Sequence, residues 1–180
     1  MKKFLSILLA MVIVLGLCAC GGSGEKTPET PANLQIGFSR INATPTYDVS
    51  LHGYGEEKLR ITSTFTHYIY ITCIAAKYGE DTILVYTLDI GSLRNGVPEL
   101  IRQSASEATG IPGENIFFSA THTHSGPSLF YDSAANQRYQ SEYYQHIATA
   151  GKMAVRDLAD ATVSSTQFEI EGMNFVRHYI

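Results

Sequence analysis

Apolar residues at alternate positions first become regular at residues 34 to 41, LQIGFSRI. Leu34, Ile36 and Phe38 recur at every second position, which is the period of a strand with one buried face. A second run of aromatic and β-branched residues extends from Leu59 to Ile74, and TILVYTLDIG follows it after the turn YGED. This pattern predicts a hairpin of two long strands, of which the second is largely buried.

Further along the chain the spacing of apolar residues changes to three and four, which is typical of helices. NGVPELIRQSASEATG, residues 95 to 110, has Pro98 where a first helical turn tolerates it and Gly110 where a helix can end. A second helix is predicted from about Gln140 to Ala159. The residues expected on its core face are Tyr143, Ile147, Ala150, Ala154 and Leu158.

A short buried strand is predicted from Ile116 to Ala120, between the two helices, and STQFEIEGMNFV alternates again as a last strand at residues 165 to 176. The turn-rich residues 42 to 57 predict a long loop after the first strand. Strands interleaved with two helices predict the α/β class, a mixed sheet with helices packed on it. A chain of 180 residues has room for one such domain with a substantial core.

Residues 1 to 19 have the pattern of a secretion signal. A lysine pair precedes an apolar run that is too short to span a membrane. The run ends in LCAC, which resembles the bacterial lipoprotein box, and Ala19 supplies the small residue that precedes the lipidated cysteine. We therefore predict lipidation of Cys20 and an extracytoplasmic protein held on a bacterial membrane by its lipid anchor. An ordinary cleaved signal with incidental cysteines is the alternative.

Residues 20 to 33, rich in Gly, Ser, Pro and Thr, are predicted to be a flexible tether, and the folded part is expected at residues 34 to 180. Removal of the signal takes away two lysines and no acid, so the formal charge changes from −4 to about −6. This charge gives no reason to expect a nucleic acid partner. Apart from Cys20, the mature chain keeps only Cys73, which excludes an intramolecular disulfide and predicts a small buried apolar residue.

The candidate chemistry lies in FFSATHTHSGPSLF, residues 117 to 130. His122 and His124 follow the predicted strand directly, and an extended backbone would project both to the same side with their backbones about 6–7 Å apart. Sites in α/β sheets usually lie at the carboxyl ends of strands, and two converging imidazoles are suitable first ligands for zinc. A bare His-x-His is equally compatible with two hydrogen-bonded histidines that bind nothing.

The surrounding residues carry a resemblance to a known family. ATHTHSGP resembles the signature of the neutral ceramidases, the zinc-dependent amidases that split ceramide into sphingosine and a fatty acid. IGFSRINATP resembles the opening segment of that family, with Asn42 where Asp is usual. LHGYG resembles its Met-Gly-Tyr-Gly turn, with His52 in place of Met, and TLDIG resembles its Ser-x-Asp-Ile-Gly strand end. The four motifs occur in the family's order, and the resemblance covers residues 34 to 180.

The resemblance implies roles for individual residues. His122 is expected to bind Zn²⁺, and His124 is expected to line the same pocket as a catalytic residue that orients the zinc-bound water or the substrate amide. NFVRHY resembles the family's Asn-x-Asn-Arg segment, so Arg177 is expected to be a catalytic residue that stabilises developing negative charge. His52 is a weaker candidate, and Asp89 is expected to be structural. The implied substrate is ceramide or a related lipid amide or ester.

We expect the chain to be an incomplete, amino-terminal part of a ceramidase-like catalytic domain. The family's remaining zinc ligands, a histidine, a glutamate and a tyrosine, come from sequence beyond position 180, so the piece itself is expected to be inactive. Other His-x-His enzymes fit less well: Gly126 and Pro127 stand where a metallo-β-lactamase site needs Asp and His, and a TIM-barrel amidohydrolase carries the motif after its first strand.

The alternative function is a non-catalytic surface lipoprotein that binds a ligand or a protein partner. Such a protein would use its aromatic-rich strands and LFYDSAANQRYQSEYY, residues 129 to 144, as a contact surface.

Overall fold

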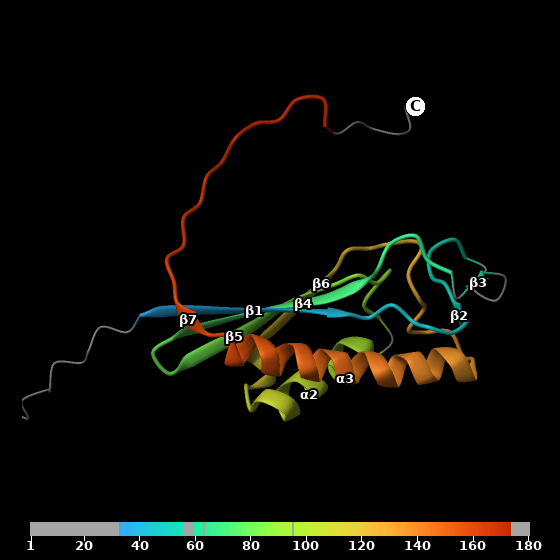
Figure 1. The fold of residues 1–180 in the computed structure, drawn as a ribbon, viewed down its shortest axis with the longest axis horizontal. Helices are drawn as coiled ribbons and strands as arrows, with labels where there is room; N and C mark the ends of the chain where they lie inside the picture. The colour runs from blue at the N-terminus through green and yellow to red at the C-terminus, as the bar shows by residue number, and fades with distance from the viewer. Residues whose placement is uncertain (1–32, 56–59, 63, 95, 174–180) are drawn as a thin grey trace, which may run out of the picture. The chain divides into compact units, whose positions relative to one another are not determined.

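A computed structural model describes residues 33–55, 60–62, 64–94 and 96–173. Its main element is a five-stranded mixed sheet with the strand order β6-β5-β4-β1-β7 (Figure 1). β1 is antiparallel to β4 and β7, β4 is antiparallel to β5, and β6 is parallel to β5. The strands are β1 Leu34–Asn42, β4 Tyr70–Tyr78, β5 Asp81–Leu88, β6 Ile116–Ala120 and β7 Ala159–Asp160. A second sheet pairs the two-residue strands β2 Val49–Ser50 and β3 Ile61–Thr62.

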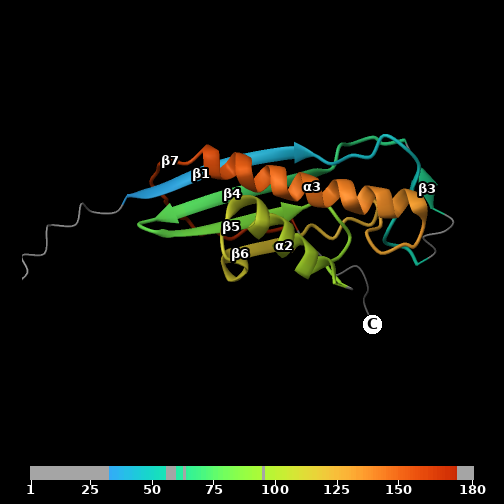
Figure 2. The same ribbon diagram turned by 90° about the horizontal axis from the view of Figure 1, so that it is seen from below.

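Two helices cover one face of the main sheet (Figures 1 and 2). Helix α2, Val97–Thr109, connects the parallel strands β5 and β6, which need such a crossover, and the short 3₁₀ helix η2, Gly113–Asn115, precedes β6. Helix α3, Ala134–Arg156, packs along α2 and across β1 and β4. This arrangement confirms the predicted α/β fold, a mixed sheet with helices packed on it.

The core lies between this helix layer and the sheet. Every second residue of β4 and β5 turns toward the helices and is buried: Ile71, Cys73, Ala75, Leu84, Tyr86 and Leu88. They meet four of the five residues predicted on the core face of α3, which are fully buried: Tyr143, Ile147, Ala150 and Ala154. Each of the large aliphatic side chains among them contributes about 1.5–3 kcal/mol, so this interface is the main source of stability.

The opposite face of the sheet is exposed in the described part of the chain. On β5 and β6 the alternate residues that face away from the helices are exposed, and Phe117 is 53% exposed. The prediction that these strands are largely buried was therefore wrong for half of their residues. A continuous apolar run suggests burial on both faces, but the helices cover only one.

Three predicted boundaries also differ from the structure. The first hairpin strand begins at Tyr70, not at Leu59, because residues 64–69 form a bend. Helix α3 begins six residues before the predicted start, at Ala134, where the Ser133 hydroxyl accepts a hydrogen bond from the Asn136 amide and caps the helix. Residues 161–173 contain no regular element, so the predicted last strand is wrong as far as it is described. Their alternating apolar residues meet no neighbouring strand.

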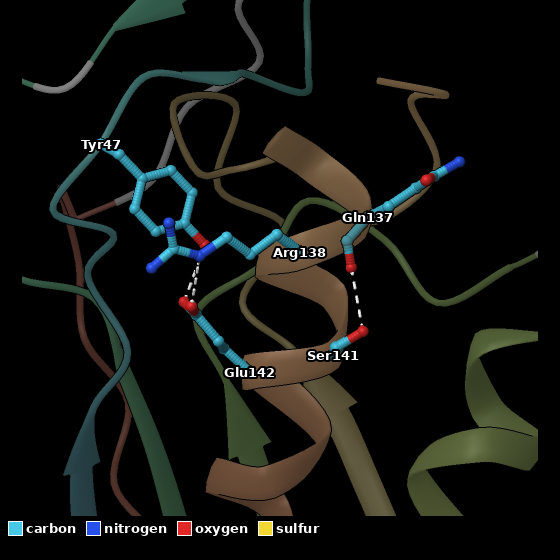
Figure 3. A network of polar contacts seen from close by, with 5 residues as sticks. All are labelled: Tyr47, Gln137, Arg138, Ser141 and Glu142. Carbon is cyan, nitrogen blue, oxygen red and sulfur yellow. Dashed lines mark hydrogen bonds and ion pairs between the residues drawn. The ribbon is translucent and has the colours of Figure 1, made fainter. Parts of the chain in front are cut away.

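Several aromatic and apolar residues of the segment proposed as a contact surface for a non-catalytic protein are internal. Leu129 is 4% exposed, and Tyr139 and Tyr143 are buried in the core against the sheet. On the outer side of the same helix, Glu142 accepts hydrogen bonds from the Tyr47 hydroxyl and from Arg138 (Figure 3). These two donors lower the pKa of the Glu142 carboxyl. Because Tyr139 and Tyr143 are buried against the sheet, they stabilise the fold.

The predicted signal, lipidation site and tether, with Cys20, lie outside the described residues, as does Arg177. Among the residues that the structure describes, no helix is both long enough and apolar enough to cross a membrane.

Candidate functional site

Three sequence motifs meet at the end of the sheet where β5 and β6 finish. Because these strands are parallel neighbours with Leu88 opposite Ala120, the residues that follow them emerge at the same edge. The amide of Thr121 donates to the Leu88 carbonyl over 2.9 Å. The LHGYG turn joins them, since the His52 amide donates to the Gly126 carbonyl, also over 2.9 Å. The sequence motifs that are far apart in the chain are thus one structural cluster.

His122 and His124 form the centre of this cluster. Their Nε2 atoms lie 3.2 Å apart and their ring centroids 4.8 Å apart. The prediction of an extended backbone was wrong: His122 has φ 60°, in the left-handed region, and is the only described non-glycine residue with positive φ. This conformation turns the chain so that the two rings meet tip to tip, which confirms that the imidazoles converge.

The Gly91 carbonyl determines the tautomer of His122. Its oxygen lies in hydrogen-bond contact with Nδ1 of His122. A carbonyl can only accept, so Nδ1 carries the proton and Nε2 keeps its lone pair toward His124. Zinc-bound histidines commonly hold their second nitrogen in this way.

The spacing of the two Nε2 atoms fits a shared metal ion. Two nitrogen ligands about 2.0–2.1 Å from a tetrahedral zinc lie about 3.3 Å from each other, close to the observed 3.2 Å. A direct hydrogen bond between the rings has the same length, so the distance alone permits both states. Among the described residues no group of three or more His, Cys, Asp or Glu side chains is placed to hold a metal. The described part of the cluster therefore brings two imidazole nitrogens together.

Arg60 braces the histidine turn against the LHGYG turn. Its guanidinium donates to the His52 carbonyl and to the His124 carbonyl, each over 3.0 Å. It also lies 4.7 Å above the ring of Tyr54, whose edge packs on His124 with centroids 5.2 Å apart. Sequence reasoning overlooked Arg60 and Tyr54. Tyr54 lies in a motif that was noticed, whereas Arg60 carries no signal in a single sequence.

Two glycines permit the close approach of these turns. A Cβ at Gly53 would lie 2.5 Å from Cα of His124, and the φ of Gly53 is 128°. A Cβ at Gly91 would overlap the His52 ring. Larger residues at either place would separate the histidines from their supports.

Asp89 and Asn42 hold backbone at the edge of the cluster. The Asp89 carboxylate accepts from the amide of Tyr70 over 2.9 Å, at the start of β4. The Asn42 side chain accepts from the Thr44 amide over 3.0 Å. For Asp89 this contact agrees with the structural role predicted for it.

A cavity of about 520 Å³ opens beside the histidine turn. Its wall includes the residues that alternate with the histidines, Thr121, Thr123 and Ser125, together with Phe65 and Asp89. This volume lies within the usual range for a small-molecule site. The turn that carries the histidine pair thus also contributes hydroxyl groups to the wall of a cavity.

The fold is similar to that of known enzymes. No family model matches the chain. The crystal structure of neutral ceramidase from Pseudomonas aeruginosa matches with a TM-score of 0.60 and 17% identity, over 73% of this chain and 23% of that one. A structure of a ceramidase complexed with C2 matches with a TM-score of 0.59 and 18% identity, over 72% of this chain and 22% of that one. The chain therefore has a ceramidase-like fold and spans less than a quarter of the length of these structures.

Proposed function

We propose that this chain belongs to a zinc-dependent hydrolase that cleaves the amide bond of ceramide or of a related lipid amide or ester. The observation that carries the proposal is the His122–His124 pair, with Nε2 atoms 3.2 Å apart at the carboxyl edge of a ceramidase-like sheet. The ordered motifs around the pair support the same conclusion.

The residues of this chain would have distinct tasks. His122 offers a lone pair on Nε2 while Gly91 holds its other nitrogen, so it is the proposed zinc ligand. His124 lies next to it and is proposed to orient the water or the substrate amide. Zinc, when bound, lowers the pKa of a coordinated water and polarises a carbonyl group. Arg177 keeps its predicted role of stabilising negative charge, outside the described residues.

We also propose where the protein acts, from the sequence of its first twenty residues. The signal at residues 1 to 19 and Cys20 would place the protein outside the cytoplasm on a bacterial membrane, where lipid substrates are at hand.

Zinc binding tests the proposal directly. A protein that contains this chain together with the remaining zinc ligands is purified in detergent and titrated with Zn²⁺ against a chromophoric chelator. We expect one zinc per chain, and we expect His122→Ala and His124→Ala each to weaken binding by at least about tenfold. His146→Ala, a histidine on α3, is the matched control and leaves the affinity unchanged. In a protein that supplies the other ligands, His122→Ala abolishes both zinc binding and release of fatty acid from a fluorescent ceramide analogue.

Two results would contradict the proposal. Zinc binding that survives both histidine substitutions would mean that the metal is held elsewhere. Fatty acid release that continues in a thoroughly demetallated enzyme would exclude zinc dependence. If the chain binds no zinc at all and a complete protein shows no hydrolysis, the non-catalytic lipoprotein becomes the better description.

A further inference from the structure

The exposed face of the main sheet carries an ordered apolar surface. Phe38, Ile74, Val85 and Phe117 stand opposite one another across β1, β4, β5 and β6. They form one continuous row on the face that the helices do not cover, and each of the two phenylalanines is more than half exposed. A row of large apolar side chains in water is unfavourable, and such surfaces usually have a partner.

The chemistry of this face changes along the strands. The rows nearer the start of β1 are apolar except for Asp81, which stands opposite Tyr78 at the end of β4, whereas the next row toward the histidine cluster is polar. We use the name apolar surface for nine residues of this face: Leu34, Ile36, Phe38, Ile74, Ala76, Tyr78, Ile83, Val85 and Phe117. The polar row consists of Arg40, Thr72, Thr87 and Ser119. A partner that buries apolar side chains would therefore cover only the half of the face that lies away from the histidines.

Residues 163–173 have the complementary pattern. Phe168 and Ile170 alternate with Gln167, Glu169 and Glu171, which is the pattern of a strand with one apolar side. Phe168 is 71% exposed and Ile170 is 56% exposed. A segment of this kind gains free energy when its apolar side is covered, about 1.5–3 kcal/mol for each large side chain.

The segment also starts in the right place. It follows β7, which pairs with Gln35 and Ile36 at the apolar end of β1. In Figure 1 the chain leaves β7 on the side of the sheet opposite the helices, and Figure 2 shows it behind the sheet when the helices are in front. Eleven extended residues reach about 36 Å, and a nine-residue strand is about 30 Å long, so the segment can cross the whole surface.

We propose that residues 163–173 close over the apolar surface as a strap, with Phe168 and Ile170 packed on the row Phe38–Ile74–Val85–Phe117. Glu169 and Glu171 then face water. The strap places a second layer on the sheet and leaves the polar row and the histidine cluster open. This inference depends on the sheet and the segment alone, and it is independent of the proposed function.

The chain's own segment is favoured over a second copy of the protein. A tethered segment acts at a high effective concentration without any loss of translational freedom. Two copies of a mature chain with a formal charge of about −6 would repel each other. The alternating glutamates also fit an outer surface in water better than a buried interface between two sheets.

Tryptophan fluorescence tests the strap because the natural chain contains no Trp. Phe168→Trp places a single reporter on the apolar side of the segment, and Glu169→Trp places the matched control on its polar side. We expect the emission of Phe168→Trp to be shifted to the blue and to be quenched severalfold less by acrylamide than that of Glu169→Trp. The difference should be independent of protein concentration in the range where light scattering shows monomers.

A second substitution links the signal to the surface. Val85→Lys, combined with Phe168→Trp, introduces a charge at a position that is 39% exposed. It should raise quenching to the level of the Glu169→Trp control while the circular dichroism stays unchanged. Equal quenching of the two reporters from the start overturns the proposal, as does shielding that Val85→Lys leaves intact. Shielding that appears only at concentrations where dimers form would identify a second copy as the occupant and also overturn it.

Discussion

At the scale of single residues, Arg60 shows how one side chain connects two turns that the sequence separates. Its two hydrogen bonds to the carbonyls of His52 and His124 are charge-assisted, and each planar donor points along a fixed direction. Such a bidentate contact cannot be replaced by the single ammonium group of lysine.

We therefore predict that Arg60→Ala lowers the free energy of unfolding by about 1–2 kcal/mol, because two carbonyls lose a charged donor. It should also weaken the binding of zinc by the histidine pair. Urea denaturation and the zinc titration measure these two effects. Arg60→Lys should fall between the natural chain and Arg60→Ala, and Lys152→Ala, an exposed cation on α3, should change neither. Unchanged stability and zinc affinity in Arg60→Ala would refute the bracing role.

At the scale of elements, Asn136 holds the start of α3 against the second sheet. It is 1% exposed, and its amide donates to the carbonyls of Ser50 and Ser128 while its oxygen accepts from the Ser50 amide. One side chain thus makes three hydrogen bonds to buried backbone groups of two other segments.

We predict that Asn136→Ala lowers the free energy of unfolding by about 3 kcal/mol, since three buried hydrogen bonds are lost and each contributes about 1 kcal/mol. Asn136→Asp should be at least as damaging, because a carboxylate cannot donate to the two carbonyls. The control is Gln137→Ala at the next, exposed position, where we expect a change within about 0.5 kcal/mol. Urea denaturation, monitored by circular dichroism, measures these free energies. Similar denaturation midpoints for Asn136→Ala and Gln137→Ala would contradict the prediction.

At the scale of the whole molecule, Cys73 reports on the integrity of the sheet. It lies in the middle of β4 on the helix-facing side and is fully buried. Burial raises the pKa of its thiol to about 12. The folded protein therefore keeps the thiol neutral and inaccessible, and reagents that need a thiolate reach it only after the sheet opens.

We predict that a chromogenic disulfide reagent labels Cys73 at pH 8 no faster than the molecule unfolds globally, and that urea accelerates both in parallel. The raised pKa also predicts the dependence on pH. Its contribution to stability is complete below the ordinary pKa of a thiol and is lost as the pH rises toward 12. Rapid labelling of the native protein at pH 8 would show that the helix layer does not seal the sheet.

The elements that the sequence predicted well are those with strong local patterns. β1, β6, α2 and the core face of α3 follow from periodicity, and turn residues mark most of their ends. The misplaced boundaries have other causes. The start of α3 depends on the Ser133 cap, and the aromatic run before Tyr70 bends around a cavity instead of extending. The segment 165–173 has the pattern of a strand, but no neighbour pairs with it in the described chain.

By itself, the sequence determined the α/β class, the helix faces and the positions of His122 and His124, because these depend on residue type and local spacing. Only the tertiary structure decided how the histidines meet. The left-handed turn at His122, its contact with Gly91 and the brace from Arg60 join segments that are up to about seventy residues apart, and no local pattern encodes such contacts. The structure likewise decided which face of the sheet stays exposed, since alternation gives two faces and only packing chooses the one that the helices cover.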